Sequence, residues 1–96
     1  MSNVIKSTDY CDLLKQAIVQ EGSDISAVEK IYVKAQGREE IRFTWYTEKE
    51  GKTRFQLRPL DLPEEELLEL MKVGFEKEVF SPEFRNDLKR ILAEFD

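Results

Sequence analysis

The strongest constraint on the fold lies in residues 40–59, where apolar and polar residues alternate on both sides of a charged turn. Residues 41–47 alternate, residues 48–52 carry Gly51 among charged side chains, and residues 53–58 alternate again. Successive side chains of an extended chain point to opposite faces, so each run offers one apolar face. The pattern predicts a β-hairpin.

A further alternating run, residues 28–36, precedes the hairpin and is joined to it by a short polar segment, residues 37–40. We therefore expect a three-stranded antiparallel meander that ends at Pro59, because proline cannot donate to a ladder. We expect the odd-numbered side chains to face the core and the even-numbered ones to face solvent. The predicted inner face consists of Ile31, Val33, Ile41, Phe43, Trp45, Phe55 and Leu57.

Helices are predicted on both sides of the meander. Three candidate N-caps, Ser7, Thr8 and Asp9, mark the start of a helix over residues 8–21, whose apolar residues recur at helical spacing up to Gly22. Pro63 after Asp61, and Pro82 after Ser81, are helix start signals. We expect a two-layer α+β fold of order α-β-β-β-α-α, with the helices on one face of the sheet. Its 96 residues suit one domain, 1–96.

The charge and cysteine content limit the partners and the cellular location that we expect for the protein. The formal net charge is −5, which argues against non-specific binding of nucleic acid or membrane by the whole molecule. No apolar run approaches the roughly 20 residues that cross a bilayer. Cys11 is the only cysteine, so the chain forms no internal disulfide, and we expect a small buried side chain there. The expected location is cytoplasmic.

Several chemistries are excluded by residue type. The chain has no histidine, which removes Ser-His-Asp and Cys-His catalysis, and one cysteine cannot build a usual zinc site. The four glycines are scattered, so no phosphate-binding loop is predicted. Glu65 and Glu69 share a helix face, but acidic residues at a helix start usually serve its dipole. We expect no enzyme activity, no catalytic residue, no metal and no cofactor.

Two surfaces are candidate binding sites. The outward sheet face would combine cations with tyrosines, which suits phosphates and bases but is also an ordinary solvated face. Its candidate residues are Lys30, Tyr32, Lys34, Arg42, Tyr46, Arg54 and Arg58. The second candidate is an apolar docking surface formed by Leu68, Val79, Phe80 and Phe84. The last helix carries further large apolar residues, which we expect to belong mainly to the core: Leu88, Ile91, Leu92 and Phe95.

The predicted order of helix, three strands and helix is similar to that of double-stranded-RNA-binding domains. Those domains place lysines at the start of the helix after the third strand, whereas this chain has glutamates at residues 64–66. The resemblance is therefore confined to topology and implies no RNA binding.

The sequence predicts a small non-catalytic binding or accessory module that acts through protein–protein contacts, as a regulator or inhibitor of a larger machine. Self-association, as a homodimer that pairs through an edge strand, is one form of such contact. The alternative is nucleic-acid binding through the basic, tyrosine-containing sheet face. A membrane partner is not expected.

Overall fold

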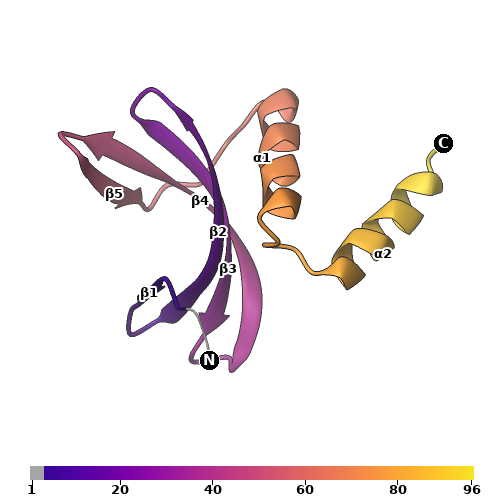
Figure 1. Cartoon of the computed structure of the whole chain (residues 1–96), viewed down its shortest axis with the longest axis horizontal. Helices are drawn as coiled ribbons and strands as arrows, with labels where there is room; N and C mark the ends of the chain where they lie inside the picture. The colour runs from indigo at the N-terminus through magenta and orange to yellow at the C-terminus, as the bar shows by residue number, and fades with distance from the viewer. Residues whose placement is uncertain (1–3) are drawn as a thin grey trace.

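The computed structural model describes residues 4–96, which form a five-stranded antiparallel sheet followed by two helices (Figure 1). Each strand pairs with the next one along the chain, so the strand order is β1-β2-β3-β4-β5. The strands are β1 (Lys6–Ser7), β2 (Cys11–Glu21), β3 (Asp24–Val33), β4 (Arg38–Lys49) and β5 (Lys52–Gln56). The helices are α1 (Glu64–Glu76) and α2 (Pro82–Ala93).

The predicted order α-β-β-β-α-α is wrong, because residues 11–21 form the long strand β2 rather than a helix. The order is β-β-β-β-β-α-α. The topological similarity to double-stranded-RNA-binding domains disappears with this correction. The hairpin around Gly51 and the helix starts at Pro63 and Ser81 are confirmed as β4–β5, α1 and α2.

A bulge explains why β2 resembles a helix in sequence. Leu13 pairs with Ile31 and Lys15 pairs with Lys30, so Leu14 is an extra residue in the ladder. The extra residue moves the following side chains to the opposite face. Cys11 and Leu13 are therefore buried on one face of the sheet and Ala17 on the other, and the apolar residues of the two faces together imitate helical spacing.

One face of the sheet is covered by α1, and we call it the helix face. The helix packs on β2 and β3, where Leu70, Val79 and Phe80 meet Ala17 and Val28. Gly74 permits this close approach, because a Cβ there would lie 2.6 Å from Phe80 and 3.0 Å from Val28. A helix is about 10 Å wide and strands are about 4.8 Å apart, so a single helix covers about two strands.

The opposite face is concave, because the sheet curls into a half-barrel whose edge strands bend away from α1 (Figure 1). Residues on this concave face are buried although no helix lies on it. One cluster contains Cys11, Leu13, Ile31 and Val33. Curling brings the side chains of neighbouring strands together, so this small chain has a second core within its sheet.

The predicted inner face is therefore divided between two faces. Val28 pairs with Phe43, so the odd-numbered residues of β4 share a face with the even-numbered residues of β3. Ile41, Phe43 and Trp45 lie on the helix face, whereas Ile31 and Val33 lie on the concave face with Phe55. The prediction that odd-numbered side chains face the core and even-numbered ones face solvent is wrong, because both faces of the sheet bury side chains.

Candidate interaction surfaces

Helix α2 projects from the body of the protein (Figure 1). None of its residues is buried, and it packs extensively against no other element of residues 4–96. Its apolar side chains nevertheless follow the spacing 4, 3 and 4, which produces one stripe along the helix. The α2 stripe consists of Phe84, Leu88, Ile91 and Phe95, the last of which directly follows the C-cap Glu94, with Leu92 at its margin. Phe95 is 81% exposed, so the expectation that these residues join the core is not met.

The first turn of α2 is nevertheless well anchored. The ring of Phe84 lies 5.1 Å from that of Phe80 and 6.3 Å from that of Phe75, measured between centroids. The Oγ atom of Ser81 accepts a hydrogen bond from the amide of Phe84, and Pro82 follows the cap. A capped and packed first turn fixes where the helix starts. The stripe is therefore presented by an ordered helix.

The two margins of the α2 stripe differ in charge. Arg85 and Lys89 are four residues apart and lie on one side, while Asp87 and Glu94 lie on the other. Arg90 donates a hydrogen bond of 3.2 Å to Asp87 on the acidic side. Arg85 and Lys89 form no ion pair within residues 4–96. The basic margin therefore keeps its charge available.

The predicted apolar docking residues separate into two pairs. Val79 and Phe80 are buried beneath α1, where they hold the helix on the sheet. Leu68 is 73% exposed and Phe84 is partly exposed, so these two remain accessible. The larger accessible apolar surface is the distal α2 stripe, which the sequence shows as a periodic pattern but does not place outside the core.

The concave face holds a buried carboxylate, Glu29, which no pattern in the sequence distinguishes from other polar strand residues. Glu29 is 0% exposed. Its two oxygens accept hydrogen bonds from Gln16 Nε2 at 2.7 Å, from Arg42 Nε at 2.9 Å and from Tyr46 OH at 2.6 Å. Arg42 Nη2 adds an ion pair at 2.8 Å. Because donors from β2 and β4 meet on β3, this network ties three strands together.

The network changes the ionisation of its members. Burial raises the pKa of the Tyr46 hydroxyl above its ordinary value, and its hydrogen bond to Glu29 raises it further. Burial alone would lower the pKa of Arg42, but the hydrogen bond and the charge of Glu29 outweigh it and leave a raised pKa. The Arg42 guanidinium also lies 5.3 Å from the centre of the Phe55 ring. Arg42 is therefore a fixed cation of the sheet.

The seven predicted basic-face residues do not form one surface. Lys30, Tyr32 and Arg54 lie on the helix face, whereas Arg42 and Tyr46 point into the concave face. Lys34 donates a hydrogen bond of 2.7 Å to the carbonyl oxygen of Thr8. Arg58 lies outside the sheet, after the end of β5. Binding of nucleic acid by these residues stays a prediction. A steep loss of affinity with added salt would be its signature.

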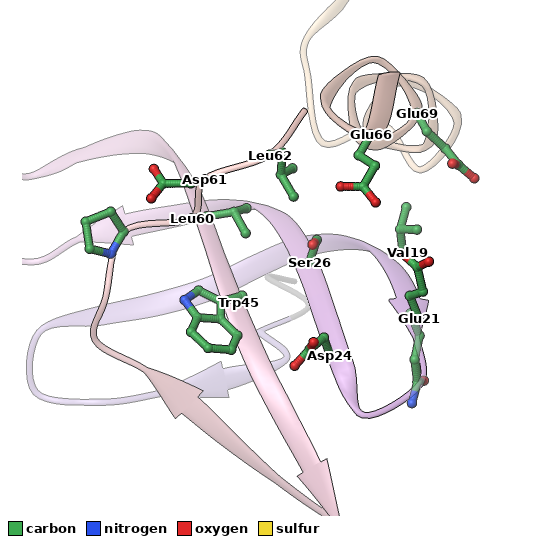
Figure 2. A pocket seen from close by; sticks show the side chains of 12 residues that line it. Val19, Glu21, Asp24, Ser26, Trp45, Leu60, Asp61, Leu62, Glu66 and Glu69 are labelled. Carbon is green, nitrogen blue, oxygen red and sulfur yellow. The ribbon is translucent and has the colours of Figure 1, made fainter. Parts of the chain in front are cut away.

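A groove of about 710 Å³ opens where α1 begins, between the segment before α1 and the β2–β3 hairpin (Figure 2). Val19, Trp45, Leu60 and Leu62 contribute apolar surface to it. Five carboxylates also line it: Glu21, Asp24, Asp61, Glu66 and Glu69. No lysine or arginine is among its lining residues, so the groove is strongly acidic.

Within residues 4–96, no group of three or more cysteine, aspartate and glutamate side chains is placed to hold a metal ion. Neither helix of this described region has the length and apolar character needed to cross a membrane. Fold and surfaces together define a small α+β domain with a curled antiparallel sheet and an uncovered C-terminal helix. Comparison with protein-family models, curated protein sequences and solved structures finds no match.

Proposed function

We propose that this chain is a protein-interaction module that binds its partner through the exposed stripe of α2. The observation that carries the proposal is an ordered helix whose apolar stripe beyond Phe84 has no cover within residues 4–96. A contiguous exposed apolar surface on a small domain usually marks an interface. The module works without catalysis, as a regulator or inhibitor of a larger assembly.

The energetics favour docking of the distal half of the stripe. Ile91, Leu92 and Phe95 are all exposed. Each large apolar side chain contributes about 1.5–3 kcal/mol when it becomes fully buried. An amphipathic helix that lies in a groove is a common recognition mode, with anchors at the spacing found here. The preformed helix also avoids the entropy cost of ordering the segment on binding.

The chemistry of the partner follows from the margins of the stripe. It needs an apolar groove wide enough for one helix face, with carboxylates along the side that meets Arg85 and Lys89. Such pairs at the rim set orientation and association rate more than affinity. We place this contact in the cytoplasm, where the free thiol of Cys11 would remain reduced.

The test compares two paired variants of the full chain as bait in the native cell lysate. Ile91→Ser with Phe95→Ser removes two stripe anchors, while Asn86→Ser with Ala93→Ser changes the opposite side of the same helix. We expect wild type and the Asn86/Ala93 variant to retain the same partner, and the Ile91/Phe95 variant to lose it.

Both variants should unfold at the wild-type urea concentration, because none of the four side chains is buried. The captured partner should also remain bound as salt is raised, since the contact is mainly apolar. Equal capture by all three proteins would show that α2 is not the docking element.

A further inference from the structure

One edge of β4 is open over residues 38–44. Strand β3 pairs with β4 from Arg38 to Thr47, whereas β5 pairs only with Trp45 to Lys49. Residues 38–44 thus have a strand neighbour on one side only, within the described part of the chain. The outward N–H and C=O groups of such an edge are a template for another strand.

We propose that two copies of this chain form a homodimer by antiparallel pairing of their β4 edges, with Ile41 at the centre. A two-fold axis perpendicular to the sheet keeps each face on its own side. Directly paired residues must share a face, so the central residue must lie opposite its own copy. Each possible register is therefore defined by the residue that lies on the two-fold axis.

Charge selects among these registers. A centre at Glu40 or at Arg42 sets identical charges directly opposite each other, which destabilises a strand pair. A centre at Ile41 instead pairs Glu40 with Arg42 of the second copy, and this pair occurs twice by symmetry. Within one copy Glu40 already accepts a hydrogen bond from Arg38 at 2.7 Å and Arg42 donates one to Glu29, so the two cross-strand pairs place opposite charges side by side without replacing these contacts.

The length of the open edge selects the same centre, because Ile41 is the midpoint of residues 38–44. In this register Arg38 of the second copy lies opposite Thr44. Beyond Arg38 the chain turns away at Gly37, which has a positive φ of 63°. The second strand therefore ends where β5 begins, and the two do not compete for the same edge.

Exposed apolar side chains lie where the proposed dimer would cover them. Ile41 and Phe43 are on the helix face of β4, beyond the reach of α1, and are 41% and 43% exposed. Leu57 directly follows β5 and is 92% exposed. The pairing sets Ile41 against its copy, with Phe43 next to it. None of the residues that form the proposed strand pair belongs to α2, so the homodimer is independent of the proposed function.

The first experiment measures molecular mass by sedimentation equilibrium over a range of protein concentrations. Wild type should behave as a monomer–dimer equilibrium. Glu40→Lys should weaken dimerisation at least tenfold, since it sets two cations opposite each other at both symmetric positions. Glu65→Lys makes the same charge change on the exposed surface of α1 and should leave the dimer unchanged. A wild type that stays monomeric at every concentration overturns the proposal.

The second experiment tests the register by disulfide cross-linking. Residues directly opposite each other have Cβ atoms about 4.5–5.5 Å apart, so mild oxidation of Ile41→Cys should give a covalent dimer. Phe43→Cys should not, because the two copies of that position would be about 13 Å apart. Cys11 is buried and stays out of the reaction. Cross-linking of Phe43→Cys in preference to Ile41→Cys would refute the register.

Discussion

At the scale of single residues, Glu29 is the most consequential side chain of the sheet. Replacing it with glutamine preserves its shape but removes the charge that neutralises Arg42. An ion pair that loses one buried partner leaves an uncompensated charge. We expect Glu29→Gln to lower the free energy of unfolding by about 3 kcal/mol, measured by urea denaturation.

The matched control is Glu39→Gln, which lies on the neighbouring strand β4. Glu39 is exposed and lies 4.0 Å from Lys30, so its loss should change the free energy of unfolding by less than about 0.5 kcal/mol. Equal effects of the two substitutions would mean that the buried network contributes no more to the free energy of unfolding than an exposed ion pair does. The sequence does not reveal Glu29, because it resembles any other polar residue of an alternating strand.

Tyr46 gives the protein a pH dependence at the alkaline end. Its pKa is raised above 10.0 in the folded state, so the folded protein keeps a proton that the unfolded chain loses near pH 10. The contribution of the protonated Tyr46 hydroxyl to the free energy of unfolding is therefore complete below pH 10, and it is lost as the pH rises further. We expect the free energy of unfolding to fall more steeply above pH 10 in wild type than in Tyr46→Phe. Parallel curves for the two proteins would contradict this assignment.

At the scale of elements, the contact between α1 and the sheet depends on the missing side chain of Gly74. Alanine usually favours a helix over glycine by about 1 kcal/mol. Here its Cβ would lie 2.6 Å from the Phe80 ring, and overpacking of a core costs about 1–3 kcal/mol. We therefore expect Gly74→Ala to lower the midpoint of thermal unfolding.

Lys72→Ala is the control for this prediction, since it changes an exposed position of the same helix. It should leave the midpoint nearly unchanged. A higher midpoint for Gly74→Ala would show that Phe80 moves aside at little cost and that the helix packs less tightly than its geometry indicates.

The elements also show which sequence signals are reliable. The start signals at Pro63 and Ser81 depend on local backbone chemistry, and both helices begin there. The helix predicted over the residues of β2 is wrong because the signal for this strand is not local. Its bulge at Leu14 and its burial on both faces result from pairing with β3 and from the curl of the sheet. Periodicity within one segment contains neither piece of information.

At the scale of the whole molecule, the sequence identifies apolar residues but not what covers them. The periodic residues of α2 suit a core helix as well as a docking helix. Ile41 and Phe43 alternate as core residues do, yet α1 is too narrow to reach them. Exposure depends on how many strands one helix can cover, and that number follows only from the assembled sheet.

The α2 stripe and the open β4 edge lie on separate elements that make no extensive contact within residues 4–96. Effects at distant sites without shared partners usually add. We expect the Ile91→Ser/Phe95→Ser variant to dimerise with the wild-type dissociation constant, while Glu40→Lys captures the same partner as wild type. Sedimentation equilibrium and quantitative capture measure the two properties on the same preparations.

The alternative outcome has a distinct physical meaning. A Glu40→Lys protein that fails to dimerise and also loses its partner would show that the partner recognises two α2 helices held at a fixed spacing. Dimerisation would then raise affinity through effective concentration, and a tethered pair of Glu40→Lys chains should restore capture. Independent surfaces predict that tethering has no effect beyond doubling the number of bound partners. The tethered variant therefore separates a two-surface module from a single bivalent one.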